Sequence, residues 1–211
     1  MAKTKTRVRD ADATKGRILE AAKQEFAKLG LGGARVDEIA LQAQANKRMI
    51  YHYFGSKEEL FTVVLEEAYI DIRTAEQKLE LEHLPAAEAL RKLVTFTWQY
   101  YLDNPEFIRL VNSENLHQAR HIKESKRLQE VSRRFTGMVA DILKRGEQEG
   151  VFRPGIDPVQ LNITIAAIGY YYLTNRFTGS FLFEKDFMSA DALKARLAFN
   201  LDTIMRLVAR D

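Results

Sequence analysis

Apolar side chains recur at spacings of three and four residues along most of this 211-residue chain, the period of one face of an α-helix. The chain has only 11 glycines and 4 prolines, far fewer than a fold of many short strands and turns requires. Hydrophobic residues make up 46% of the sequence, enough for a buried core in one or two domains. We therefore predict an all-α fold of about nine helices and exclude an all-β fold.

The residue types available restrict the chemistry of the chain. It contains no cysteine, which excludes disulfides, thiolate metal sites and a cysteine nucleophile. It also lacks the Gly-rich phosphate loop, the His-Glu-x-x-His motif and the Gly-x-Ser-x-Gly motif. We therefore expect a protein that is not an enzyme, with no catalytic residues, no metal site and no cofactor.

Neither a signal peptide nor a membrane span is predicted. The longest nearly apolar run covers residues 163–173, well short of the roughly 18 residues that suggest a membrane helix. Residues 1–9 include four Lys or Arg and no apolar stretch of the kind found in secretory signals. We expect a cytoplasmic protein with no membrane partner.

Positive charge is concentrated in the N-terminal quarter. Residues 1–57 contain 12 Lys or Arg against 6 Asp or Glu, a net charge of +6, whereas residues 58–211 contain 20 against 23, a net charge of −3. A basic region at one end of a molecule is typical of proteins that bind nucleic acid. A basic face that meets only solvent is the alternative that charge alone leaves open.

Two short helices are predicted within this basic quarter. The first has apolar residues at helical spacing, namely Val36, Ile39, Ala40 and Ala43. Asn46 is placed to cap the second, whose inward positions are Ile50 and Phe54. Its outward side chains are Lys47, Arg48, Tyr51 and His52. A helix that carries such donors near its N-terminal end suits the major groove of DNA, so the pattern favours a helix-turn-helix; a helical hairpin with a solvated basic face is the alternative.

A longer helix is predicted on each side of this pair. The preceding one covers residues 14–29 and ends at Gly30, with an inward face of Ile18, Ala22, Phe26 and Leu29. The following one opens at a capping box that starts at Ser56, with an inward face of Phe61, Val64, Leu65 and Ala68. Further helices are expected after residues 85 and 104, around residues 128–142, from 157 to about 177, and from Ser189 onward.

Residues 18–61 contain the runs ILEAAKQEFAKLG and VDEIALQAQANKRMIYHYFGSKEELF, which combine a helix, a turn, two tyrosines and a capped helix. This combination resembles the TetR family of one-component transcriptional regulators. The sequence departs from the family pattern at three places. Gln44 stands where a turn glycine is usual, Arg48 and Met49 stand where small or hydroxyl residues are common, and Arg35 replaces a usual Thr cap.

The resemblance implies that the chain binds a double-stranded DNA operator that contains an inverted repeat. It implies base contacts from Lys47, Arg48 and His52 and phosphate contacts from Tyr51, Tyr53 and Lys57. The basic residues from Lys3 to Arg9 would add non-specific or minor-groove contacts, or would form a disordered, solvated arm. Such a protein is found at the bacterial nucleoid when it is bound to DNA.

The resemblance also divides the chain into four parts. These are a basic and disordered N-terminal arm (1–13), the helix-turn-helix domain (14–57), a connecting helix (58–84), and a helical domain for effector binding and dimerisation (85–211). We expect a homodimer and a repressor that a small-molecule effector releases from its operator, by way of the connecting helix.

Candidate residues for these two roles come from the aromatic-rich and apolar C-terminal part, where 14 of the 21 aromatic residues fall between residues 96 and 187. The candidate effector pocket consists of Phe96, Trp98, Tyr101, Phe135, Tyr171 and Asn175. The candidate dimer interface consists of Ile163, Ala167, Tyr170, Leu197, Leu201 and Met205. Burial in the core of a single chain is the plain alternative for each of them.

Two other functions remain open from the sequence. A helical adaptor that binds only protein would also present a basic patch, and its binding would lack the steep salt dependence of DNA binding. A metal-binding helical bundle is suggested weakly by the pairs Glu80 with His83 and Glu114 with His117, the Glu-x-x-His spacing of di-iron proteins. His117 and His121, with Glu114 on the same face, form a further weak candidate for a metal site, against which stands a solvated polar face.

Overall fold

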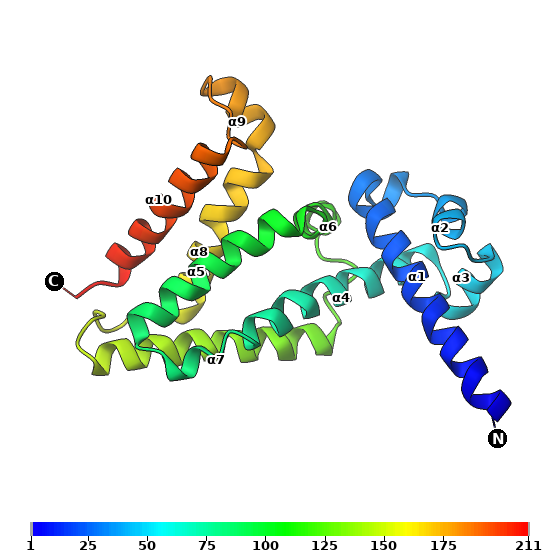
Figure 1. Ribbon diagram of the computed structural model, residues 1–211, viewed down its shortest axis with the longest axis horizontal. Helices are drawn as coiled ribbons and strands as arrows, with labels where there is room; N and C mark the ends of the chain where they lie inside the picture. Colours follow the sequence, from blue (N-terminus) through cyan, green and yellow to red (C-terminus); the bar gives the residue numbers. More distant parts are fainter. Residues whose placement is uncertain (1, 211) are drawn as a thin grey trace. The chain divides into compact units, whose positions relative to one another are not determined.

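The computed structural model describes residues 2–210, with side chains from residue 11 to residue 210. This part of the chain forms ten α-helices and one short 3-10 helix, η1, and it contains no β-strand (Figure 1). The helices are α1 (Ala2–Gly33), α2 (Val36–Gln42), α3 (Lys47–Phe54), α4 (Lys57–Gln77), η1 (Leu81–His83), α5 (Ala86–Asp103), α6 (Pro105–Leu116), α7 (Lys126–Gln148), α8 (Pro158–Thr174), α9 (Arg176–Leu182) and α10 (Ala190–Val208). The all-α prediction is confirmed.

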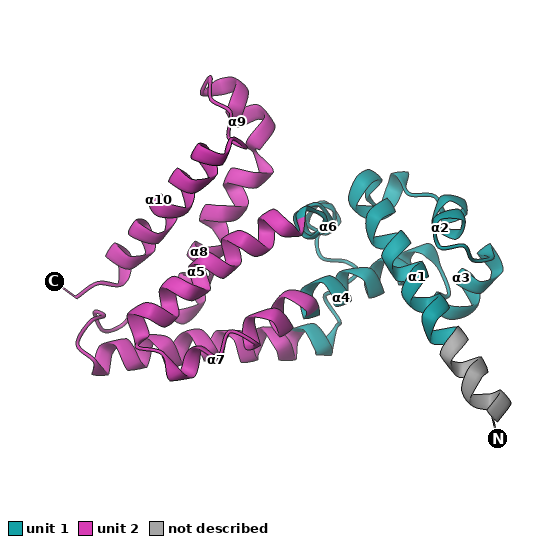
Figure 2. Cartoon of the chain, in the orientation of Figure 1, with its two compact units in different colours: residues 1–70, 105–128 teal, residues 71–104, 129–211 magenta. Residues whose placement is uncertain are grey.

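The described chain divides into two compact units, coloured separately in Figure 2. Unit 1 contains residues 1–70 and 105–128, and unit 2 contains residues 71–104 and 129–211. Unit 1 therefore includes α6 in addition to the predicted helix-turn-helix, and α6 packs along α1. Two helices, α4 and α7, each begin in unit 1 and end in unit 2.

The core of unit 1 is built on the inward face of α1. Ile18, Ala22 and Phe26 are fully buried, and the ring of Phe26 meets that of Phe61 edge to face at a centroid distance of 5.0 Å. The prediction that Leu29 continues this face is wrong, because its side chain is 47% exposed and Leu31 is buried instead.

The backbone of α1 explains this difference. Gly30 has a φ of 67° and a ψ of 175°, so the helix is interrupted there and resumes as far as Gly33. Gly30 was predicted to end this helix, a position that requires a positive φ, and glycine adopts a positive φ without a steric penalty. The interruption changes the direction of the residues that follow, and Leu31 fills the inward position.

Predicted caps are present at the helix starts. Asn46 accepts a hydrogen bond from the amide of Arg48 at 2.8 Å, and Ser56 accepts one from the amide of Glu59 at 3.0 Å. Ser189 caps α10 in the same way. Such caps stabilise a helix by about 1 kcal/mol each. They fix the starts of α3, α4 and α10 close to their predicted residues.

The start of α2 is held differently. Arg35 occupies the N-cap position and makes no side-chain cap. Its backbone amide instead donates to the carboxylate of Glu25, a buried residue of α1, at 3.3 Å. Glu25 therefore holds the backbone at the N-cap residue of α2 from a neighbouring helix, while no side chain of Arg35 caps the first turn.

Unit 2 is a helical bundle whose core is formed by α5, α7, α8 and α10. The fully or almost fully buried side chains include Leu90, Leu93, Val94, Phe135, Val139, Ile142, Leu161, Ile165, Ile204 and Val208. Gly169 lies against the rings of Trp98 and Tyr101, and a Cβ at this position would be 3.5 Å from both. Arg145 donates to the carbonyl of Leu81, which fixes η1 at one end of the bundle.

The apolar segment after Asp157 differs from the prediction. We predicted one helix to about residue 177, but α8 ends at Thr174 and a separate helix, α9, begins at Arg176. The side chains of Phe177 and Phe181 in α9 are 74% and 82% exposed. No helix in the described residues combines the length and the apolar character that crossing a membrane requires.

Candidate functional site

Helices α2 and α3 form the predicted helix-turn-helix, and its small core is largely as expected. Ile39, Ala40 and Ile50 are buried, whereas Phe54 is half-buried. The turn between the helices passes through Gln44, which has a φ of 50°. This is the left-handed region that favours glycine, the residue that is usual at this place in the family pattern.

The three predicted base-contacting side chains lie on the exposed side of α3. Lys47, Arg48 and His52 are all exposed, and the buried Ile50 between them holds the helix against the rest of unit 1. A helix that is anchored on one side and presents donors on the other has the form that major-groove recognition requires.

Lys47 is paired with a residue of α2. Its Nζ lies 2.8 Å from a carboxylate oxygen of Asp37, and both side chains are about half exposed. The hydrogen bond and the charge of Lys47 lower the pKa of Asp37, and the same contact raises the pKa of Lys47. The ion pair keeps both groups charged and directs Lys47 back toward α2.

The predicted phosphate-contacting side chains differ from one another in their surroundings. Tyr51 is 45% exposed and available to a partner. Tyr53 is half-buried, with the Nζ of Lys15 5.3 Å from its ring centroid. Lys57 donates to the backbone carbonyl of Ala34 at 3.2 Å, so this side chain also holds the loop between α1 and α2.

Two basic residues of α1 were not among the predicted site residues. Lys15 stacks on Tyr53, and Arg17 donates from Nε to the carbonyl of Ala43 at the end of α2. The sequence did not indicate these two residues, because both contacts join parts of the chain that are far apart in the sequence and meet only in the folded structure. The side chains of the basic segment from Lys3 to Arg9 lie outside the described residues.

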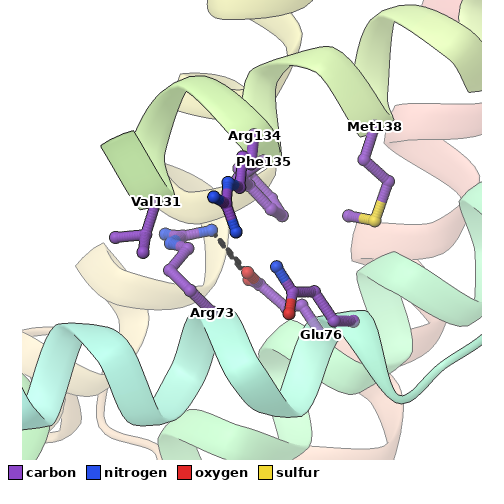
Figure 3. Close-up of a pocket in the computed structure, with 7 residues that line it drawn as sticks. Arg73, Glu76, Val131, Arg134, Phe135 and Met138 are labelled. Carbon is purple, nitrogen blue, oxygen red and sulfur yellow. Dashed lines mark hydrogen bonds and ion pairs between the residues drawn. The ribbon is translucent and has the colours of Figure 1, made fainter. Parts of the chain in front are cut away.

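Within unit 2, Phe135 lines a small cavity of about 30 Å³, room for about one water molecule, between α4 and α7 (Figure 3). Arg73 and Glu76 of α4 form an ion pair in its wall, with Nη1 of Arg73 2.9 and 2.6 Å from the two carboxylate oxygens. The guanidinium carbon of Arg73 lies 3.9 Å from the centroid of the Phe135 ring. Phe135 was predicted as a pocket residue, whereas Arg73 and Glu76 were not.

The other five predicted pocket residues lie elsewhere in unit 2. Trp98 and Tyr101 are buried in the core, and Phe96 is half-buried beside Tyr100. Tyr171 is 68% exposed, and the side-chain amide of Asn175 donates to the carbonyl of Tyr171. The structure therefore does not bring all six candidates to the cavity that Phe135 lines.

The predicted interface residues vary in exposure. Ile163 and Ala167 are exposed on α8, whereas the remaining four, Tyr170, Leu197, Leu201 and Met205, are half-buried. Leu201 and Met205 pack against the core of their own unit. Several more exposed apolar side chains of unit 2 were not among the predicted interface residues, namely Val159, Phe177, Phe181, Leu182, Phe183 and Phe199.

The suggested metal-binding pairs lie in ordinary surroundings. Glu80 has a left-handed backbone conformation before η1, and His83 within η1 is exposed. Glu114 is buried and accepts hydrogen bonds from both the backbone amide and the ring of His121, at 2.8 and 2.7 Å. Among the described residues, no group of three or more His, Asp or Glu is placed to hold a metal ion.

The fold and the exposed basic helix define a helix-turn-helix protein of the bacterial transcriptional regulator class. Residues 18–64 match the family of bacterial regulatory proteins described as the tetR family, and residues 85–204 match the tetracyclin repressor-like C-terminal domain. The chain belongs to the TetR family, as its resemblance predicted. It is therefore a DNA-binding regulator of transcription and not an enzyme.

Relatives cover nearly the whole chain. The HTH-type transcriptional repressor NicS of Pseudomonas putida is 39% identical over 208 residues, which are 99% of this chain and 98% of the relative. The HTH-type transcriptional repressor SCO4008 of Streptomyces coelicolor is 32% identical over 163 residues, 76% of this chain and 78% of the relative. A solved structure of a tetR-family regulatory protein from Rhodococcus RHA1 superposes with a TM-score of 0.72 at 20% identity, covering 94% of this chain and 98% of that one.

Proposed function

We propose that this protein is a transcriptional repressor that binds an inverted-repeat operator as a homodimer and leaves it when a small molecule binds to unit 2. The observation that carries this proposal is the exposed face of α3, which presents Lys47, Arg48 and His52 while Ile50 anchors the inward side of the same helix. The relatives NicS and SCO4008 are both named as repressors, which supports repression as the direction of control.

The proposed contacts divide by chemistry. Lys47 and Arg48 are donors at the start of α3, and they suit the acceptors O6 and N7 of guanine in the major groove. His52 lies one turn further along the same face. Tyr51, Tyr53 and Lys57 bind phosphate oxygens. The contact of Lys57 with the carbonyl of Ala34 does not prevent this role, since an ammonium group has three donors.

Exposed apolar side chains of unit 2 support the homodimer. They lie on α8, α9 and α10 and include Ile163, Phe177, Phe181 and Phe199, all more than half exposed. Soluble single chains rarely leave so many large apolar side chains open to water, whereas interfaces between subunits are rich in them. A two-fold dimer places two copies of α3 on successive half-sites and so gives the operator its inverted symmetry.

The proposed division of labour follows the predicted parts of the chain. Residues 14–57 bind DNA, residues 58–84 connect, and residues 85–211 bind the effector and the second chain. We place the protein in the cytoplasm, at the nucleoid when it is bound to its operator.

The test is selection of random duplex DNA by the purified protein near physiological salt, followed by sequencing. Enrichment of one inverted repeat is expected, with binding that weakens steeply as salt rises. Arg48→Ala is expected to relax the sequence preference, while the control Lys28→Ala, at an exposed position of α1, leaves the preference unchanged. Sequence-independent binding by the unaltered protein would contradict the proposal.

A further inference from the structure

The loop that follows α6 surrounds a polar surface cavity in unit 1. The cavity has a volume of about 240 Å³ and is lined by Leu116, His117, Gln118, Arg120 and Lys123. This volume lies below the range of about 300–1,000 Å³ that is typical of sites for drug-sized molecules, and such sites are mostly apolar. Four of the five lining residues here are polar, so the cavity suits a small polar ligand.

The charged groups in this lining are cations. Arg120 and Lys123 are exposed, and no ion pair among the described side chains involves either of them. His117 adds a ring N–H donor, and the five lining residues include no carboxylate. A guanidinium and an ammonium group without a counter-charge beside the same cavity favour an anion as its occupant.

The backbone that carries these side chains is strained and firmly held. Gln118 and Ala119 are consecutive residues with a φ of 57°, in the left-handed region that favours glycine. The carbonyl of Glu114 accepts hydrogen bonds from the amides of His117 and Ala119 at 3.0 and 3.2 Å, and its buried carboxylate accepts one from the amide of His121 at 2.8 Å. Strained backbone persists where neighbouring groups fix it, and it is typical of binding sites. The loop is therefore fixed before any ligand binds.

We propose that this cavity binds the phosphoryl groups of a small molecule, with a diphosphate as the best match. A terminal phosphoryl group presents three oxygens around one phosphorus, so His117, Arg120 and Lys123 can each donate to a different oxygen. A carboxylate presents two oxygens in one plane and uses fewer of these donors. A diphosphate also carries more negative charge than a single phosphate, and it therefore gains more from two neighbouring cations.

The DNA backbone has the same phosphoryl chemistry, but its place on the molecule is a different one. Helix α6 packs along α1, and Figure 1 shows α6 and α3 on opposite sides of α1. A duplex that meets the exposed face of α3 therefore lies away from the loop after α6. The inference goes beyond the proposed function, since it assigns a second anion site to the unit that contains the helix-turn-helix.

The same loop region contacts the helix that follows α3. The ring of His121 meets that of Phe61 in α4 edge to face at a centroid distance of 5.2 Å, and the hydroxyl of Ser125 donates to the carboxylate of Glu66 in α4. An anion that binds the folded loop and not the unfolded chain stabilises the folded state. Its binding is therefore expected to raise the melting temperature of the protein.

The experiment is isothermal titration of the full-length protein with pyrophosphate in HEPES buffer at constant ionic strength. Orthophosphate, ADP and malonate, a dicarboxylate, are titrated in the same way. We expect one pyrophosphate per chain, and binding of orthophosphate and of malonate that is weaker by about tenfold or more. Affinity for ADP equal to or above that for pyrophosphate would support a nucleotide as the occupant, and lower affinity would support free pyrophosphate.

Four variants locate the binding. Arg120→Gln and Lys123→Gln are each expected to weaken pyrophosphate binding by about tenfold, because each removes a charged hydrogen bond. Lys126→Gln removes the same charge at an exposed position outside the lining and is the matched control. Arg48→Gln tests the exposed face of α3 and is expected to leave pyrophosphate binding unchanged. All four residues are exposed, and circular dichroism establishes that each variant is folded.

Absence of pyrophosphate binding, or an equal loss in Lys126→Gln and Arg120→Gln, would overturn the site. Binding that is lost in Arg48→Gln and kept in Arg120→Gln would place the anion on the face of α3 instead. Equal affinity for pyrophosphate and malonate would overturn the assignment to phosphoryl groups. None of these measurements involves operator DNA, so their outcome does not depend on the proposed function.

Discussion

The Nζ of Lys47 lies 2.8 Å from the carboxylate of Asp37, so the first residue of α3 is paired with the first turn of α2. This contact places a negative charge beside the helix that is proposed to enter the major groove. It also gives Lys47 a partner that it must exchange before it can donate to a base.

Asp37→Asn is expected to strengthen binding to any DNA duplex by about three- to tenfold, because it removes a charge that repels phosphate and frees Lys47. Fluorescence anisotropy with specific and random duplexes at several salt concentrations measures the effect. Glu38→Gln changes the net charge equally, and Glu38 has no ion pair with Lys47. Equal gains from the two variants would mean that only net charge matters.

Arg48→Ala and Tyr51→Phe are expected to act on different properties of DNA binding. Loss of a base contact lowers the discrimination between the selected site and a mutated site by about 1–3 kcal/mol. Loss of the Tyr51 hydroxyl weakens binding to both sites by the same factor, because phosphates carry no sequence information. Competition binding with paired duplexes separates the two effects. Identical behaviour of the variants would contradict the division into base and phosphate contacts.

Gln44→Gly is expected to stabilise the protein, because Gln44 has a φ of 50°. A side chain in the left-handed region costs about 1 kcal/mol, part of which is offset by the greater freedom of glycine in the unfolded chain. Gln42→Gly, at the last residue of α2, is the matched control and is expected to destabilise. Urea unfolding at a fixed protein concentration reports both changes, and a loss of stability in Gln44→Gly would contradict the prediction.

Glu76 makes the stability of the protein depend on pH. Its pKa is raised from 4.5 to about 7 in the folded state, so between these values the folded protein holds a proton that the unfolded chain has released. The free energy of unfolding therefore falls as pH rises through this window, by about 3 kcal/mol in total. Above pH 7 both states are deprotonated and the loss is complete.

The measurement is urea unfolding of the wild type and Glu76→Gln from pH 5 to pH 8. The variant lacks the titrating group, so its stability relative to wild type is expected to increase as pH rises. Glu124→Gln, at an exposed position, serves as the control. A constant difference between wild type and Glu76→Gln across this range would show that the carboxyl group is not perturbed.

Phe199→Lys is expected to dissociate the proposed dimer, because Phe199 is 62% exposed on α10 and a charge there cannot be buried cheaply between two chains. Sedimentation velocity detects the change in mass, and operator affinity is expected to fall with it. Leu116→Lys replaces an apolar residue of unit 1 that is 84% exposed, and it should leave the mass unchanged. A Phe199→Lys protein that remains dimeric would place the interface elsewhere.

Local rules predicted much of the fold from the sequence. The caps Asn46, Ser56 and Ser189 act on amides two or three residues away, so their effect is readable without tertiary information. The division between α8 and α9 was missed because apolar residues continue past Asn175 and no glycine or proline marks the break.

The exposed face of α3 was also predictable, since Ile50 and Phe54 indicate which side turns inward. Contacts between helices were not. The hydrogen bond from Lys57 to Ala34 joins residues 23 positions apart. The cavity that Arg73 and Glu76 share with Phe135 joins residues about 60 positions apart. An Arg and a Glu three residues apart usually form a solvated pair, so only the burial of Glu76 distinguishes this one.

The exposed apolar side chains of α8, α9 and α10 have a consequence for the lifetime of the molecule. If they are covered only in the dimer, unfolding is coupled to dissociation, and mass action makes the melting temperature rise with the concentration of the chain. Newly made chains at low copy number would then be the most vulnerable to proteolysis and aggregation. The apolar side chains that form the proposed dimer, and so give the operator its two-fold symmetry, would then also determine the lowest concentration at which the protein stays folded.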